Sequence, residues 1–123
     1  NVHDYESLNN LDEITFKDND DLEIFCILPW QIESIKSKID FFHNASSFVE
    51  MENKTVNHYI KHIEQILNPN HTIYCTSYLN NDEKTLDPTR IQKMFKSDHD
   101  FEKFTKKSSI INEDEVLHFY YQS

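Results

Sequence analysis

The sequence predicts an α/β fold, a small single-domain sandwich whose mixed or parallel sheet of three or four strands has helices packed on it. Short runs rich in β-branched and aromatic residues alternate along the chain with segments of helical periodicity. A length of 123 residues suits one domain with its own core. No apolar run reaches the ~20 residues that a membrane helix needs. An α+β fold with an antiparallel sheet is the alternative.

The first elements are expected between residues 13 and 28. Residues 13–17 alternate between polar and apolar side chains and predict a short edge strand, and residues 18–21, of which three are acidic, then form a turn. Residues 22–28 are apolar except at Glu23, which is typical of a strand covered on both faces. We therefore expect an acidic arm over residues 1–20, partly disordered or an edge strand, and a single globular domain over residues 21–123.

Helical spacing predicts a helix directly after this strand. Pro29 suits a first helical turn, where its missing N–H is not needed. Apolar side chains then recur three or four positions apart, at Ile32, Ile35, Ile39 and Phe42. A second helix is expected from residue 54 to 67, where Asn-Pro-Asn ends it.

The second half of the chain predicts strands at 72–79 and 116–121. Both runs are rich in β-branched and aromatic residues, although residues 112–115 equally suit the cap of a final helix. Between them, Asp87 and Pro88 begin a third helix. Phe101 and Phe104 are three positions apart and continue its apolar face.

The chain contains no glycine. A bias toward Asn, Lys and Ile at the expense of Gly, Ala and Arg is typical of an AT-rich genome. Without glycine there is no dinucleotide-binding fingerprint, no phosphate-binding P-loop and no nucleophile elbow. Positions with φ > 0 are expected to fall on Asn or Asp.

The net charge of −10 is concentrated near the N-terminus. Residues 1–25 contain eight acidic residues against Lys17 alone. Such a surface repels a phosphate backbone, so we expect no direct nucleic-acid binding. Basic proteins are the natural partners, with Asp18, Asp20 and Asp21 as candidate contacts.

Aromatic residues supply the other candidate partner-binding positions. Trp30 is the only tryptophan and lies where the first strand meets the first helix. Phe119, Tyr120 and Tyr121 put more large side chains on the last strand than one covered face accepts. If that strand lies at an edge, it could pair with a partner's strand or with a second copy.

Two arrangements could support chemistry. Cys75 with His71 or His118 could form a thiol–imidazole pair, and His58 with His62 has the spacing of two metal ligands. A buried inert thiol and a solvated histidine pair explain the same residues more simply. We therefore predict no catalytic residue, metal or cofactor.

The function expected from these features is a non-catalytic protein–protein interaction or assembly domain of a larger, intracellular protein. A small hydrolase or transferase that depends on a cysteine or a metal is one alternative. A secreted or surface effector is another, because Asn44, Asn53 and Asn70 stand in N-glycosylation sequons.

Overall fold

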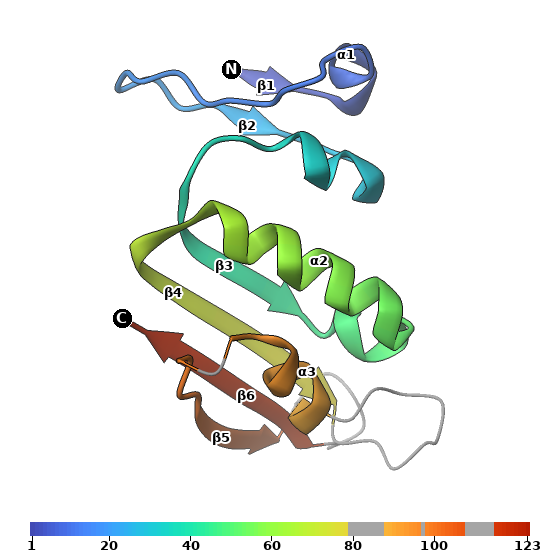
Figure 1. The fold of residues 1–123 in the computed structure, drawn as a ribbon, viewed down its shortest axis with the longest axis vertical. Helices are drawn as coiled ribbons and strands as arrows, with labels where there is room; N and C mark the ends of the chain where they lie inside the picture. The colour runs from blue at the N-terminus through green and yellow to red at the C-terminus, as the bar shows by residue number, and fades with distance from the viewer. Residues whose placement is uncertain (79–87, 97, 108–114) are drawn as a thin grey trace. The chain divides into compact units, whose positions relative to one another are not determined.

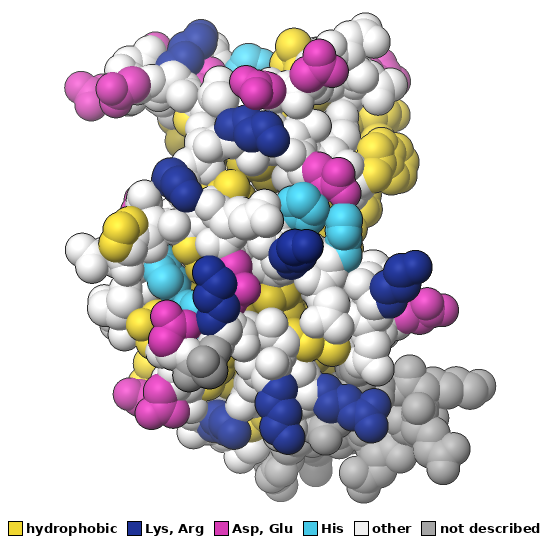
Figure 2. Space-filling view, in the orientation of Figure 1, with side chains coloured by type: hydrophobic (Ala, Val, Ile, Leu, Met, Phe, Trp, Pro, Cys, Tyr) yellow, Lys and Arg dark blue, Asp and Glu magenta, His cyan; other side chains and the backbone are white. Residues whose placement is uncertain are grey.

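The computed structural model describes residues 1–78, 88–96, 98–107 and 115–123. The chain divides into two compact units, residues 1–38 and residues 39–123. Figure 1 draws the chain as a ribbon, and Figure 2 draws its atoms as spheres from the same viewpoint. The division falls after residue 38, so the domain boundary expected after residue 20 lies inside the first unit.

The first unit consists of short elements. Strands β1 (Val2–His3) and β2 (Ile24–Phe25) pair in parallel, with helix α1 (Tyr5–Leu8) and the 3-10 helix η1 (Pro29–Ser34) beside them in sequence. Leu8 and Ile14 are buried. The Asp4 carboxylate caps α1 by accepting a hydrogen bond from the Ser7 N–H.

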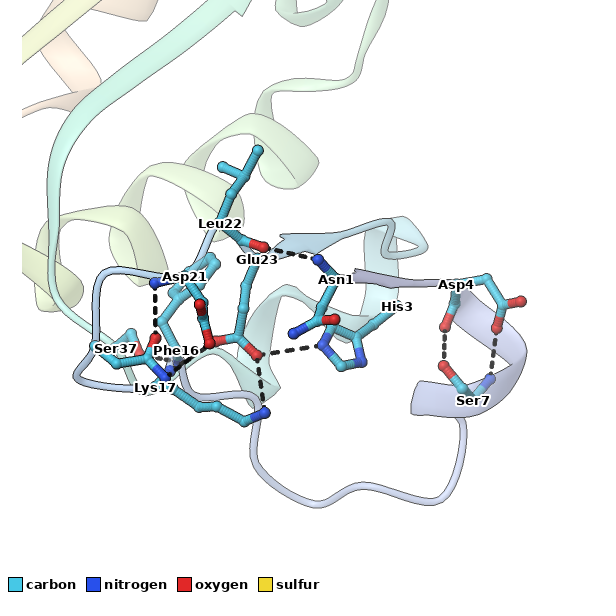
Figure 3. A network of polar contacts seen from close by, with 11 residues as sticks. Asn1, His3, Asp4, Ser7, Phe16, Lys17, Asp21, Leu22, Glu23 and Ser37 are labelled. Carbon is cyan, nitrogen blue, oxygen red and sulfur yellow. Dashed lines mark hydrogen bonds and ion pairs between the residues drawn. The ribbon is translucent and has the colours of Figure 1, made fainter.

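Glu23 is the centre of a polar network in this unit (Figure 3). Its carboxylate accepts a hydrogen bond of 2.7 Å from the Lys17 backbone N–H, and its other oxygen lies 3.3 Å from His3 Nε2. The hydrogen bond from Lys17 is the main reason why the pKa of Glu23 is below its usual range. Glu23 therefore fixes the loop that contains Asp18, Asp20 and Asp21.

The strand predicted over residues 22–28 is wrong in its length and in its burial. Only Ile24 and Phe25 are in a strand, and Leu22 and Ile24 are exposed. The strand predicted over residues 13–17 is reduced to one bridge between Ile14 and Ile35. The parallel pairing of β1 and β2 covers two positions only, so most side chains of residues 22–28 have no second layer to pack against.

The second unit is a four-stranded mixed sheet with helices packed on it, and it confirms the predicted fold class (Figure 1). The sheet order is β3-β4-β6-β5, where β3 and β4 are parallel and the other pairs are antiparallel. In chain order the elements are β3 (Ile39–Ala45), η2 (Ser47–Glu50), α2 (Asn53–Ile66), β4 (Leu67–Tyr78), α3 (Pro88–Met94), β5 (Glu102–Lys107) and β6 (Glu115–Gln122).

The core of this unit lies between one face of the sheet and the two helices. Helix α2 buries Val56, Ile60 and Ile63, which follow one another at helical spacing. Helix α3 buries Ile91, followed by Phe95. From the sheet come Ile73, Cys75 and Ser77 on β4 and Phe119 on β6. The predicted helix over 54–67 and the predicted strands over 72–79 and 116–121 are thus confirmed within the described residues.

The helix predicted to follow Pro29 is wrong beyond its first turns. The 3-10 helix ends at Ser34, and the chain becomes extended at Ile35. Ile39 and Phe42 belong to β3, which pairs with β4 along its length. Isoleucine and phenylalanine favour strands as well as buried helix positions, and backbone pairing with a strand far along the chain decides between them.

Phe101 and Phe104 are also not helical. The strand β5 begins at Glu102, so a separation of three residues places the two rings on opposite faces. Phe101 contacts Phe119 on the helix side, whereas Phe104 is stacked on His118 on the other side. Asp87, the predicted cap of the third helix, lies outside the described residues.

The one described residue with positive φ is Ser46, not Asn or Asp. Its φ of 62° and ψ of 3° turn the chain from β3 into η2. The Ser46 N–H donates to the Thr76 carbonyl oxygen at 3.1 Å, and the two hydroxyl oxygens lie 2.9 Å apart. These contacts with β4 stabilise a left-handed conformation that serine does not favour by itself.

Asn44, a sequon residue, is buried beside this turn. Its amide donates to Ser47 Oγ at 2.6 Å, and its oxygen accepts from the Phe48 N–H. Asn53 and Asn70 are exposed. Among the described residues, no helix is long and apolar enough to cross a membrane.

Candidate functional site

The sheet of the second unit has two different faces. Strand alternation places odd-numbered residues of β4 against the helices and even-numbered ones on the opposite face. Helices α2 and α3 both lie over the first face (Figure 1). The second face is covered by neither helix, and many of its side chains are exposed or half-buried.

Aromatic rings extend across the second face from one edge strand to the other. We call these residues the aromatic face; they are Phe41, His43, Tyr74, His118, Phe104 and Tyr120. The His43 ring lies 5.2 Å from that of Tyr74, and the Phe104 ring is stacked on that of His118 at 4.6 Å. Phe41 is 58% exposed and Phe104 is 46% exposed. Exposed aromatic side chains that cluster in this way mark an interaction site more often than isolated ones do.

Hydrogen bonds hold the rings in place. The Tyr74 hydroxyl lies 2.5 Å from His118 Nδ1. The Tyr120 hydroxyl donates to the Glu102 carboxylate, and this bond raises the pKa of Tyr120. Both tyrosine rings therefore have an orientation that is fixed before any ligand arrives.

The environment of His118 also favours its neutral form. Burial against the neighbouring rings is the main reason why its pKa is below 6.5, and the nearby Lys106 ammonium adds to the shift. A neutral imidazole accepts the hydrogen bond from Tyr74 and stacks on Phe104 without the desolvation cost of a charge. The aromatic face thus has no imidazolium at its centre at neutral pH.

This shift predicts a pH dependence of stability. The unfolded chain takes up the His118 proton at a higher pH than the folded chain does, so the stabilisation is complete above pH 6.5 and decreases on acidification. We expect the urea midpoint to fall between pH 7.5 and pH 5. His118→Phe should make this fall smaller, and an unchanged pH profile in the variant would contradict the assignment. His62→Phe, on α2, is the matched control.

The candidate partner-binding residues are divided between the two units. Trp30 is 69% exposed on η1, and Asp18, Asp20 and Asp21 are exposed in the loop before β2. Tyr120 belongs to the aromatic face. Phe119 is 0% exposed and Tyr121 points to the helix side, where it contacts His99. Phe119 is therefore a core residue and is withdrawn as a candidate contact.

The last strand is not at an edge. β6 is hydrogen-bonded to β4 on one side and to β5 on the other. The edges of this sheet are β3 and β5. The expectation that β6 pairs with a partner or with a second copy is therefore wrong, because both of its backbone edges are already used.

Cys75 is not close to either histidine that was considered as its catalytic partner. The thiol is buried on the helix side, and burial raises its pKa to about 12. His118 projects to the opposite face, and His71 is four residues away along β4, roughly 13 Å at strand spacing. Neither histidine is placed to accept its proton. The rings of His58 and His62 do contact each other on α2, with centroids 4.7 Å apart.

The sequence pattern missed most of the aromatic face. Phe41 and Phe104 were expected in helical segments, and Tyr74 and His118 were expected in strands without a known partner. The alternation of strand residues in 72–79 and 116–121 could have indicated part of this face, because Tyr74, His118 and Tyr120 all occupy even positions. Their common face became defined only with the register of β4 against β6.

Comparison with known families and with curated proteins finds no match for this sequence. The function must therefore be inferred from the chemistry of the chain itself.

Proposed function

We propose that this chain is a non-catalytic module that binds a basic segment of a partner protein on the aromatic face of its second unit. The observation that carries the proposal is the row of rings from Phe41 to Tyr120, which neither α2 nor α3 covers. The rings are held by mutual contacts and by hydrogen bonds. Such a surface is an interaction platform that needs little reorganisation.

The chemistry of the rings favours a cationic ligand. The faces of phenylalanine and tyrosine rings attract arginine and lysine side chains, by about 0.5–2 kcal/mol for each well-placed pair. Arginine gains further from stacking, since its guanidinium is planar. Phe41 and Phe104 are exposed enough to offer such contacts, and Glu102 supplies a carboxylate beside Tyr120.

The net charge of the whole chain also favours a cationic ligand. A net charge of −10 attracts basic segments and repels nucleic acid, the other ligand that stacks on exposed aromatic strands. Acidic residues of the first unit, including Asp18, Asp20 and Asp21, add to this steering field. We therefore infer a protein partner rather than a single-stranded nucleic acid.

Selection of peptides from a random display library tests the proposal. We expect selected peptides to contain arginine or lysine next to apolar residues. Their affinity for Phe104→Ser should fall about tenfold or more, since one buried aromatic contact and one cation–π contact are lost together. Fluorescence anisotropy with one synthetic selected peptide gives the Kd for each variant. A (dT)12 oligonucleotide serves as the nucleic-acid probe.

Trp30→Ser is the matched control, because it removes a ring of the first unit that is 69% exposed. Equal losses for Trp30→Ser and Phe104→Ser would show that any exposed ring serves, and the assignment to the aromatic face would fail. A preference for acidic peptides, or tighter binding of (dT)12, would also contradict the proposal. If Trp30→Ser alone abolishes binding, the docking site is on η1.

A further inference from the structure

A pocket of about 460 Å³ lies on the helix side of the second unit, away from the aromatic face. Helix α3, the segment that follows it and the start of β5 form its wall. Phe95 and Phe101 contribute rings to the lining. A volume of this order accommodates a small organic molecule.

Lysine side chains dominate the charge of this pocket. Lys93, Lys96 and Lys103 line it, against the one lining carboxylate of Asp100. Among the described residues, none of these lysine ammonium groups forms an ion pair. Figure 2 shows Lys and Arg side chains gathered over α3 and β5. This concentration of positive charge is unexpected in a chain of net charge −10.

Gln92 adds an unused hydrogen-bond donor. Its Nε2 atom is buried and has no hydrogen-bond partner among the described residues, and Gln92 is part of the pocket lining. A buried amide without a partner costs about 1–3 kcal/mol. Such a cost is retained in folded proteins where a ligand supplies the missing acceptor.

A pair of histidines, His71 and His99, lies beside the lysines. The Nδ1 atom of His71 faces the Asn68 carbonyl oxygen at 2.6 Å, and that of His99 faces the Lys96 carbonyl oxygen at 3.3 Å. A carbonyl oxygen only accepts, so each Nδ1 carries a proton.

The two Nε2 atoms of this pair are 2.9 Å apart. The carboxylates of Asp98 and Glu64 lie 3.4 and 3.8 Å from His99 Nδ1. The His99 side chain is 6% exposed and lines the pocket.

We propose that this pocket binds a small phosphorylated molecule. Lysine ammonium groups match the charge of a phosphate monoester, and Gln92 Nε2 offers a donor to one of its oxygens. The pocket is larger than a phosphate group alone, and Phe101 provides an apolar surface for the organic part. The inference is independent of the aromatic face, which lies on the other side of the sheet.

Calorimetric titration with AMP, adenosine and inorganic pyrophosphate tests the proposal. AMP should bind at least about tenfold more tightly than adenosine, because the phosphate adds charge-assisted hydrogen bonds. Pyrophosphate should compete with AMP. Adenosine binding as tightly as AMP, or no binding of AMP and pyrophosphate at millimolar concentration, would overturn the assignment.

Two lysines of β5 provide a matched pair of variants. Lys103 pairs with Phe119 in register and projects to the pocket side, whereas Lys106 pairs with Val116 and projects to the aromatic face. Lys103→Gln should weaken AMP binding about tenfold, and Lys106→Gln should change it by less than about twofold. Equal effects of the two variants would show that AMP responds only to the overall charge of the protein, and the proposed binding site would be wrong.

Gln92→Leu separates a binding role from a structural one. Removing a buried donor without a partner should leave the thermal midpoint unchanged or raise it. The same variant should weaken AMP binding about fivefold, because the donor to the phosphate is gone. Unchanged AMP affinity would overturn the role of Gln92, and a lowered thermal midpoint would show that its amide serves the fold.

Discussion

Replacing Phe119 by alanine is expected to lower the free energy of unfolding by about 3–5 kcal/mol. Phe119 is fully buried in the centre of the sheet, where its ring meets that of Phe101 with centroids 5.4 Å apart. Its strand neighbours in register are Cys75 and Lys103. Alanine would leave a cavity that two strands and the helix layer cannot close, and the loss of buried apolar surface adds to this cost.

Urea unfolding monitored by circular dichroism measures this effect. Phe41→Ala is the matched control, because it removes an equal ring that is largely exposed, and it should change stability by no more than about 0.5 kcal/mol. If Phe119→Ala is too unstable to purify, Phe119→Leu can be measured instead, and its free energy of unfolding should fall by about 1–1.5 kcal/mol. Similar stability losses at Phe41 and Phe119 would show that the two faces of the sheet are assigned wrongly.

The two cysteines are expected to differ in their rates of thiol labelling by a factor of about 1,000 or more. Cys75 is buried and its pKa is about 12, so only about one thiol in 10⁴ is ionised at pH 8. Cys26 is exposed in the first unit. Since the thiolate is the reacting species, Cys75 should react only when the sheet unfolds.

A disulfide reagent applied to Cys26→Ser isolates the behaviour of Cys75. We expect no labelling of the folded variant over minutes, and complete labelling in denaturing urea. Cys75→Ser serves as the control, in which Cys26 should react promptly. Rapid labelling of Cys75 in the folded protein would instead support the hydrolase or transferase alternative, since it would require an accessible thiolate.

Helices and strands could be predicted from the sequence where the residues favour that conformation locally and where the apolar residues also fall on one side of the element. The segment that forms α2 shows Val56, Ile60 and Ile63 at helical spacing, and Asn-Pro-Asn follows it. The runs that form β4 and β6 are rich in β-branched and aromatic residues, which favour strands. In these segments, local preference and tertiary packing favour the same conformation.

Residues 29–45 could not be predicted in this way. The spacing fits a helix at Ile32, Ile35, Ile39 and Phe42. However, Ile39 and Phe42 are in β3, which forms hydrogen bonds with β4, and the whole of helix α2 separates these two strands in the chain. The spacing of Phe101 and Phe104 misled for the same reason. Periodicity over so few residues cannot distinguish a helix face from a strand when the decisive partner is distant.

The sequence alone determined the class of the fold, the acidic charge and the absence of every glycine-dependent phosphate loop, because these depend on composition and on local pattern. The tertiary structure decided which aromatic residues are core and which are surface. Phe119 and Tyr120 are neighbours in the chain, yet one is sealed under the helices and the other lies on the aromatic face. That difference follows from strand register, since shifting a strand by one residue exchanges its two faces, and register is fixed only when β6 pairs with β4 and β5.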